Sequence, residues 1–146
     1  MNPVPLFLLA ISLPLLLGGS GEEGGPIKKS VNKEEIEFRG QVVYLKGSDA
    51  PYTGKIFGLL DGRNFEFHTN DGKIDGLWVT WHQNGQKLVE ANYKNGKQNG
   101  LETAWHENGQ KASESNWKDG KVLEGSRKYW NNNGESANSL EKAGLN

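Results

Sequence analysis

A repeated motif constrains the fold of this chain more than any other feature of its sequence. Residues 76–87, Gly-Leu-Trp-Val-Thr-Trp-His-Gln-Asn-Gly-Gln-Lys, return at 100–111 as Gly-Leu-Glu-Thr-Ala-Trp-His-Glu-Asn-Gly-Gln-Lys. The glycines that open successive copies, Gly76, Gly100 and Gly125, are 24 and then 25 residues apart. A period between about 20 and 50 residues is typical of stacked repeat architectures. We therefore expect a fold that grows by adding similar units rather than around one globular core.

Every copy of the repeat contains Asn-Gly or Asp-Gly between runs of β-forming residues. This pattern is a strong hairpin signal, because a type I′ turn needs positive φ at both central residues and Asn, Asp and Gly tolerate it. The predicted turn residues are Asn84, Gly85, Asn95, Gly96, Asn108, Gly109, Asp119 and Gly120. The sequence thus predicts an all-β fold, an antiparallel meander of β-hairpin repeats that forms one elongated, curved sheet.

Two-residue turns would also fix which residues share a face of the sheet. A turn closed by Asn84-Gly85 places Trp81 opposite Leu88. The same pairing brings Gly100 opposite Trp117 in the next copy. The expected core face holds Leu77, Val79, Trp81, Leu88, Leu101, Thr103, Trp105 and Ala112. The opposite face holds Trp78, His82, Val89, Tyr93, Ala104, His106 and Trp117.

The composition changes along the chain indicate several segments. The predicted organisation is a signal peptide or short anchor over 1–20, a disordered linker over 21–35, an N-terminal β lead-in over 36–53, hairpin repeats over 54–75, 76–99, 100–124 and 125–134, and a C-terminal cap or tail over 135–146. The linker is predicted to be disordered because it is rich in Gly, Glu, Lys and Ser and has few apolar residues.

The N-terminal segment contains an apolar run, Leu6–Leu17. It is shorter than the roughly 20 residues that span a bilayer as a helix and has the usual length of a signal-peptide apolar region. We therefore expect export to the periplasm or cell envelope. No Lys or Arg precedes the run, so an uncleaved anchor, or a misassigned start codon with a cytoplasmic protein, is the alternative.

Charge and cysteine usage exclude several classes of function. The net charge is −1 at pH 7, whereas nucleic-acid-binding domains usually carry a strongly basic face. We expect no nucleic-acid partner. The chain contains no cysteine, which excludes disulfides and a thiolate nucleophile.

Two pairs of residues at equivalent repeat positions could suggest chemistry. His82 and His106 resemble a metal pair, and Glu90 and Glu114 resemble a carboxylate pair. Equivalent residues of successive hairpins, however, lie two strands apart, roughly 9.5 Å. One zinc ion needs ligand nitrogens about 2 Å from it, so the histidines cannot readily share a metal. We expect no metal, no cofactor and no enzymatic activity.

The aromatic residues give a better functional lead. Trp and Tyr side chains supply large contact areas, and they recur along the predicted sheet. The candidate binding surface consists of Trp78, His82, Tyr93, His106 and Trp117. The aromatic residues expected to have structural roles are Trp81, Trp105 and Trp130.

The motif at 76–87, its copy at 100–111 and the Tyr/Trp-Lys-Asn/Asp-Gly-Lys ends at 93–97 and 117–121 resemble the MORN-repeat variant, in the arrangement carried by YwqK-type antitoxin proteins. The resemblance covers about residues 36–134. It implies a β-meander built of hairpins. It also implies an antitoxin or immunity role, in which the protein neutralises a toxin.

Three functions are consistent with these observations. The first is a non-enzymatic β-repeat scaffold that binds a protein partner at the bacterial cell envelope. The second is a YwqK-like antitoxin that neutralises a cognate toxin. The third, association with a membrane surface, has less support because the sequence lacks the Lys/Arg cluster that anionic membranes attract. Membrane contact is expected only through an uncleaved N-terminus.

Overall fold

The computed structural model describes residues 30–145 of the chain. Its elements are β1 (Ser30–Asn32), the 3-10 turn η1 (Lys33–Glu35), β2 (Ile36–Arg39), β3 (Val42–Leu45), β4 (Gly54–Leu60), β5 (Arg63–Asn70), β6 (Lys73–Trp81), β7 (Lys87–Lys94), β8 (Lys97–Trp105), β9 (Lys111–Lys118), β10 (Lys121–Val122), β11 (Lys128–Trp130) and β12 (Ser136–Ala137).

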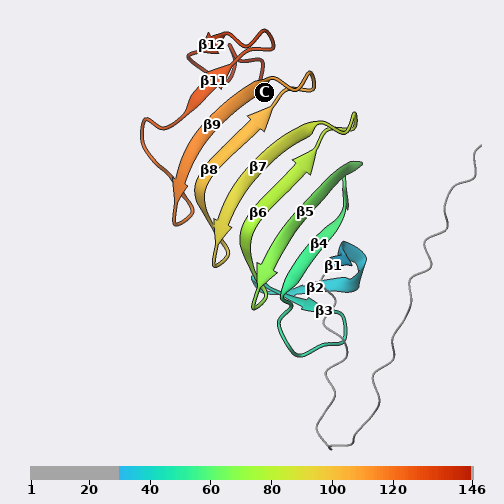
Figure 1. Ribbon diagram of the computed structural model, residues 1–146. Coiled ribbons are helices and arrows are strands. Elements are labelled where there is room, and N and C mark those ends of the chain that lie inside the picture. The colour runs from blue at the N-terminus through green and yellow to red at the C-terminus, as the bar shows by residue number, and fades with distance from the viewer. Residues whose placement is uncertain (1–29, 146) are drawn as a thin grey trace, which may run out of the picture.

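Ten of these strands form one open, twisted sheet (Figure 1). Its order is β1-β4-β5-β6-β7-β8-β9-β11-β12, with β10 also paired to β9, while β2 and β3 form a small separate sheet. From β4 to β9 each strand pairs antiparallel with the next one along the chain. The predicted all-β meander of hairpins is confirmed.

At one end of the strands, the hairpin turns have the predicted type I′ geometry. The φ values of Asp71, Asn95 and Asp119 are 48°, 49° and 51°, and the glycine that follows each of them also has a positive φ. Each of these glycines donates its N–H to a carbonyl of the preceding hairpin or lead-in, as Gly96 does to Ile74 at 2.7 Å. These turns therefore also join neighbouring repeats.

At the other end, the Asn-Gly turns of the second and third hairpins are wider than predicted. Gly85 has φ 85°, whereas Asn84 is not among the residues with positive φ. The turn is closed by the His82 N–H, which donates to the Gln86 carbonyl at 2.8 Å. Type I′ geometry was thus the wrong prediction for Asn84-Gly85, and equally for Asn108-Gly109, where only Gly109 has positive φ.

The wider turn changes the pairing of the residues next to it. Trp81 faces Lys87 rather than Leu88, because a bulge between Thr80 and Trp81 leaves Leu88 as an extra residue. Further from the turn, the predicted pairing is correct. Gly100 faces Trp117.

The two faces of the large sheet are defined by the residues that pair across it. One row of directly paired residues consists of Val31, Ile56, Phe67, Trp78, Ala91, Glu102 and Ser115. We call this set the central row and its side of the sheet the Trp78 face. On the opposite side, the Val79 face, the corresponding row consists of Phe57, Glu66, Val79, Glu90, Thr103, Glu114 and Lys128.

The main hydrophobic core lies on the Trp78 face, not on the predicted one. It consists of Val31, Ile36, Val43, Tyr52, Ile56, Phe65 and Phe67, with Leu45, Ile74 and Trp78 packed against it. On the Val79 face, Val79, Thr103 and Ala112 are buried, but Leu77 and Leu101 are exposed. The prediction of the core face was wrong because the lead-in, β2 and β3, supplies part of the core and packs on the other side of the sheet.

The lead-in begins earlier in the chain than the sequence suggested. Residues 30–35, predicted as disordered linker, form β1 and η1. Strand β1 pairs in parallel with β4, and its Val31 is 1% exposed. Asn32 caps η1 in a reciprocal capping box with Glu35. The predicted signal segment at 1–20 and linker residues 21–29 lie outside the described residues.

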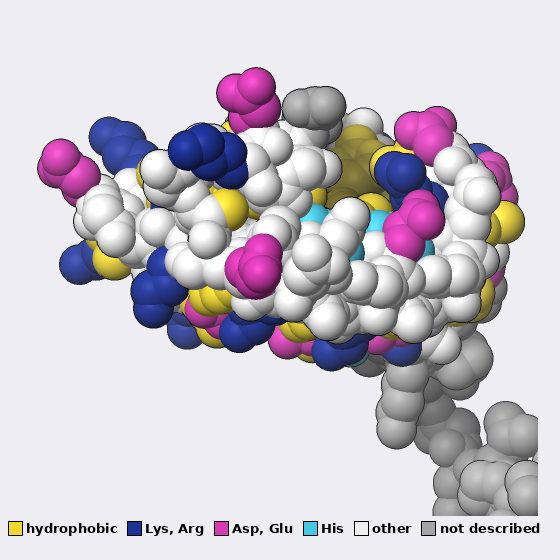
Figure 2. All heavy atoms as spheres, turned by 90° about the horizontal axis from the view of Figure 1, so that it is seen from above, with side chains coloured by type: hydrophobic (Ala, Val, Ile, Leu, Met, Phe, Trp, Pro, Cys, Tyr) yellow, Lys and Arg dark blue, Asp and Glu magenta, His cyan; other side chains and the backbone are white. Residues whose placement is uncertain are grey.

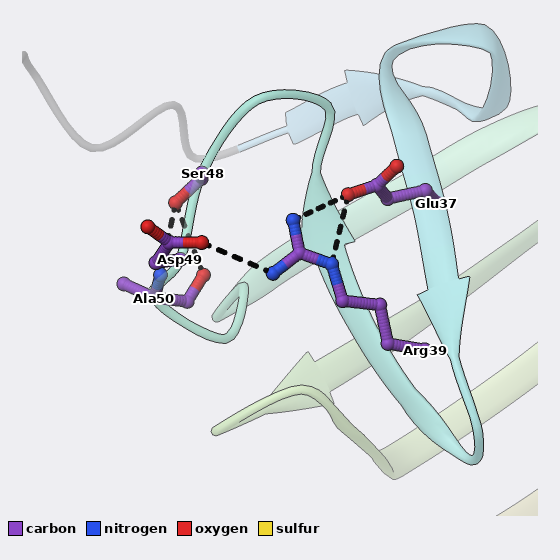
Figure 3. Close-up of polar contacts among 5 residues, drawn as sticks. All are labelled: Glu37, Arg39, Ser48, Asp49 and Ala50. Carbon is purple, nitrogen blue, oxygen red and sulfur yellow. Dashed lines mark hydrogen bonds and ion pairs between the residues drawn. The ribbon is translucent and has the colours of Figure 1, made fainter.

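A polar cluster fixes the outer side of the lead-in (Figure 3). The Arg39 guanidinium on β2 donates to Glu37 at 2.6 Å and to Asp49 at 3.3 Å. In the loop after β3, which contains Asp49, Ser48 Oγ accepts a hydrogen bond from the N–H of Ala50 at 3.1 Å. These exposed contacts link β2 to the loop after β3.

At the C-terminal end, the last strands of the sheet form a shorter hairpin. Strands β11 and β12 pair through Tyr129 with Ala137 and Trp130 with Ser136. The turn between them repeats the wider geometry, since Asn131 N–H donates to the Glu135 carbonyl at 2.9 Å. A run of turns follows, and Ala143 in it is buried.

The two classes of turn predict different changes in stability when the asparagine is replaced by glycine. Asn95→Gly should change the free energy of unfolding by less than about 0.5 kcal/mol, because glycine readily adopts positive φ. Asn84→Gly should destabilise the fold by about 1 kcal/mol or more, because two side-chain hydrogen bonds, to Gln86 and Glu107, are lost. Urea unfolding of both variants measures the difference. Equal effects would contradict the assignment of two turn classes.

Candidate functional site

The predicted binding residues His82 and His106 lie at the wide-turn end of the strands. Their Nε2 atoms are 2.8 Å from the carbonyl oxygens of Trp105 and Trp130, respectively, in the next hairpin. Since a carbonyl can only accept, each Nε2 carries the proton and donates it. The two histidines are only 8% and 7% exposed. They join hairpins and do not form part of an open binding surface.

Asparagines of the same turns repeat this pattern. Asn84 Nδ2 donates to the Glu107 carbonyl at 2.7 Å, and Asn108 Nδ2 donates to the Asn132 carbonyl at 2.7 Å. The predicted turn residues therefore hold adjacent repeats together through their side chains. In Figure 2, which looks onto the molecule from above, the histidine side chains show only small cyan areas between other atoms.

The Val79 face carries a series of lysine–glutamate ion pairs. Glu66 pairs with Lys55 at 2.5 Å and Glu114 with Lys111 at 2.5 Å, while Glu90 pairs with Lys87. The residues predicted as structural aromatics take part in this arrangement. Lys87 lies 5.6 Å from the ring centre of Trp105, and Lys111 lies 5.5 Å from that of Trp130.

Glu90 and Glu114, which resemble a carboxylate pair in the sequence, lie two strands apart on this face and are separated by Thr103. Each is already neutralised by a lysine of its own hairpin. Trp81, the third predicted structural aromatic, is half-buried at the equivalent position of the second hairpin. Among residues 30–145, no group of three or more His, Cys, Asp or Glu is arranged to hold a metal ion.

The Trp78 face carries the aromatic residues that form a continuous array. The rings of Phe67 and Trp78 stack with centroids 4.6 Å apart and planes 6° from parallel. Phe65 stacks on Phe67 at 5.9 Å. Tyr93 continues the array, with its ring centroid 6.0 Å from that of Trp78. Three of the five predicted binding residues, Trp78, Tyr93 and Trp117, are half-buried on this face.

An apolar cavity opens beside this array at the N-terminal end of the sheet. Its volume is about 300 Å³, and it is lined by Lys33, Ile36, Phe38, Leu60, Phe65, Phe67 and Trp78. Phe38 and Leu60 are 60% and 58% exposed, respectively. The cavity was not predictable from the repeat, because Phe38 and Ile36 come from the lead-in. Their β-forming pattern was visible in the sequence, but not their position over the sheet.

A polar network follows the aromatic array toward the C-terminal end. Gln98 Nε2 donates to Glu102 Oε2 at 2.5 Å, and Ser115 Oγ donates to Glu102 Oε1 at 3.3 Å. Trp117 Nε1 donates to Ser115 Oγ at 3.0 Å. Burial and, second, the Glu102 carboxylate raise the pKa of the Tyr93 phenol above its usual value. Glu102 and Gln98 were absent from the predicted binding surface.

Comparisons with known proteins identify the repeats. A family model described as the MORN repeat variant matches residues 74–95 and 98–119. Each matched segment runs from the first strand of a hairpin to the type I′ turn that follows its second strand, so the second and third hairpins are MORN-type repeats. The matches together cover less than half of the chain. No curated protein and no solved structure matches the chain.

Removing the His82 side chain should destabilise the fold. His82→Ala leaves the Trp105 carbonyl without its donor, which costs about 1 to 3 kcal/mol. His68, which is exposed on β5, provides the matched control, and His68→Ala should change the free energy of unfolding by less than about 0.5 kcal/mol. Urea denaturation gives both values. A His82→Ala variant as stable as the wild type would show that the contact contributes nothing.

Replacing Glu102 should change the titration of Tyr93. The carboxylate opposes formation of the phenolate, so Glu102→Gln should lower the Tyr93 pKa, while burial still keeps it above the ordinary value. NMR titration of ¹³C-labelled tyrosine, with Tyr93→Phe used for assignment, measures the shift. The resonances of Tyr44, which lies beside Arg39 in the lead-in, should be unaffected. An unchanged Tyr93 pKa would show that the Glu102 carboxylate is too far from the Tyr93 phenol to affect its titration.

Proposed function

We propose that this protein is a non-enzymatic repeat scaffold that binds a protein partner at the bacterial cell envelope. MORN-type repeats in the second and third hairpins support a scaffold role. The non-enzymatic assignment is supported by the bonds of the best acid-base candidates. His82 donates to a backbone carbonyl and Glu90 pairs with Lys87.

The observation that carries this proposal is the apolar cavity at the lead-in end. A cavity of about 300 Å³ is large enough to receive an apolar side chain of a partner. Phe38 and Leu60 at its rim expose more than half of their surface. Exposed apolar residues grouped around a pocket are typical of protein interfaces, in which a few buried anchors supply most of the affinity.

The cell-envelope location is proposed from the apolar run Leu6–Leu17. Among residues 30–145, no helix is long and apolar enough to span a membrane. A fusion of residues 1–29 to a reporter that is active only in the periplasm tests export. Reporter activity would support an envelope protein, and its absence would favour the cytoplasmic alternative.

A YwqK-like antitoxin role is the second candidate, favoured by the resemblance of the motif at 76–87 and 100–111. In that role, the scaffold would neutralise a toxin by covering its active surface. Co-expression with the product of an adjacent gene tests this. Growth rescue from a toxic neighbour supports the role, and a harmless neighbour removes it.

Membrane-surface association is the third and least supported candidate. Lys and Arg are interspersed with Asp and Glu on the face shown in Figure 2, whereas anionic lipids attract clusters of basic residues. The chain without its first 20 residues should fail to float with liposomes that contain anionic lipid. Flotation would revive this candidate.

Partner binding through the cavity predicts a specific loss in a pull-down from the cell envelope. Phe38→Asp places a charge at the cavity rim and should reduce recovery of the partner by about tenfold or more, which corresponds to the loss of one interface anchor. Leu123→Asp, which introduces the same charge at another exposed leucine far from the cavity, should retain the partner. Circular dichroism checks that both variants are folded. Equal recovery by both variants would exclude the cavity as the binding site.

A further inference from the structure

The repeat breaks its own pattern on the Trp78 face. The position of Trp78 in the second hairpin is occupied by Glu102 in the third, 24 residues later. Both belong to the central row and are separated only by Ala91 on β7. The carboxylate thus projects from the same face as the aromatic array, two strands further along the sheet.

Glu102 differs from the other glutamates of strands β5 to β9 because no lysine or arginine among residues 30–145 forms an ion pair with it. Glu66, Glu90 and Glu114, on the Val79 face, each pair with a lysine. Glu102 is half-buried, and within the described residues its carboxylate accepts hydrogen bonds from Gln98 and Ser115 alone. No Lys, Arg or His among residues 30–145 lies within 4.0 Å of its oxygens.

Small and aromatic residues surround this carboxylate on the Trp78 face. Its direct neighbours across the sheet are the small residues Ala91 and Ser115, which are 3% and 6% exposed. Two positions further along the same strands stand Tyr93 and Trp117. Toward β11, Glu102 also borders a recess of about 210 Å³, whose lining consists of Glu102, Ser113, Glu114, Ser115, Arg127, Tyr129 and Leu140. Two aromatic residues of the neighbouring strands therefore share the face of the sheet with Glu102.

This combination of groups is suited to a cation. A half-buried carboxylate without a counter-ion is poorly solvated, so an approaching positive charge is attracted more strongly than at an exposed glutamate. Aromatic faces add to this attraction, and aromatic residues around a carboxylate are a recurrent way to bind ammonium groups. The two hydrogen bonds to Gln98 and Ser115 hold the carboxylate in place before a ligand arrives.

We propose that Glu102, Tyr93, Trp117 and Ser115 together form a site that binds an alkylammonium group. Glu102 provides the ion pair, and the rings of Tyr93 and Trp117 contact the alkyl part and the charge. The chemistry fits either a lysine side chain of a protein or a small quaternary amine. The site is distinct from the apolar cavity beside Phe38 and does not depend on the scaffold proposal.

Among the described residues, Arg127 is the cationic side chain that lines the adjoining recess. It is exposed and does not form an ion pair with Glu102. In a ligand-bound site, its charge would repel an ammonium group. Arg127→Gln should therefore leave the affinity for a cation at least as high as in the wild type, and weaker binding would contradict the proposal.

NMR titration of the purified chain tests the site directly. The probes are Nα-acetyl-lysine methylamide, choline, and 3,3-dimethylbutan-1-ol, which has the shape of choline without its charge. Saturable shifts of the Trp117 indole N–H resonance are expected with a charged probe and not with the neutral alcohol. Tighter binding of the lysine derivative would indicate a protein ligand, and tighter binding of choline a free quaternary amine.

Matched variants distinguish the contribution of the Glu102 carboxylate from that of negative charge elsewhere on the sheet. Glu102→Gln retains the size of the side chain and should weaken binding by about tenfold or more, because a charge-assisted contact is lost. Glu90→Gln removes the same charge from the opposite face and should not change the affinity. Absence of saturable shifts, equal binding of the neutral alcohol, or full binding by a folded Glu102→Gln variant would each overturn the proposal. None of these results bears on partner recovery through the Phe38 cavity.

Discussion

Backbone pairing between consecutive strands is the constraint on which the rest of this structure depends. Each hairpin adds two antiparallel strands. The pairing is irregular between β5 and β6 and between β7 and β8, where the later strand of each pair contains two extra residues. Because two is an even number, the alternation of side chains between the faces is preserved. Residues at equivalent repeat positions therefore return to the same face. The side-chain bonds of His82 and Asn84 at one end of the strands, and the glycine N–H bonds at the other, hold this stacking in place.

Along the central row, the chemistry changes while the backbone stays the same. The row begins with the buried Val31, Ile56 and Phe67 under the lead-in and ends with Glu102 and Ser115. A sheet with a large apolar face must cover it, and the lead-in provides that cover at the N-terminal end. Further along, Ala91 and the polar residues leave little apolar surface, so the second half of the sheet needs no covering layer.

Local features were predictable from the sequence because hairpins depend on residues close together in the chain. Asp119-Gly120 and Asn95-Gly96 have the predicted turn geometry, but Asn84-Gly85 does not. The same dipeptide adopts another turn there because the asparagine side chain binds Gln86 and the next hairpin. The buried face was not predictable from the repeat alone, since Val31 and Ile36, outside the repeat, decide it. The replacement of Trp78 by Glu102 was visible in the sequence, but its significance required the structure, in which no lysine among residues 30–145 pairs with Glu102.

A repeat sheet of this kind separates folding from recognition. Turn residues and backbone pairs maintain the stack, so a residue that faces outward from the central row can change from Trp to Glu without changing the fold. Trp78 belongs both to the wall of the apolar cavity and to the row that contains Glu102, and these residues lie two strands apart, roughly 9.5 Å. An extended peptide with an apolar residue near a lysine would reach both places at once. Binding at two linked places gives higher affinity than either place alone, because the second contact forms at a high effective concentration. Trp78, as the end of the cavity wall nearest to Glu102, would contact such a peptide between the two places.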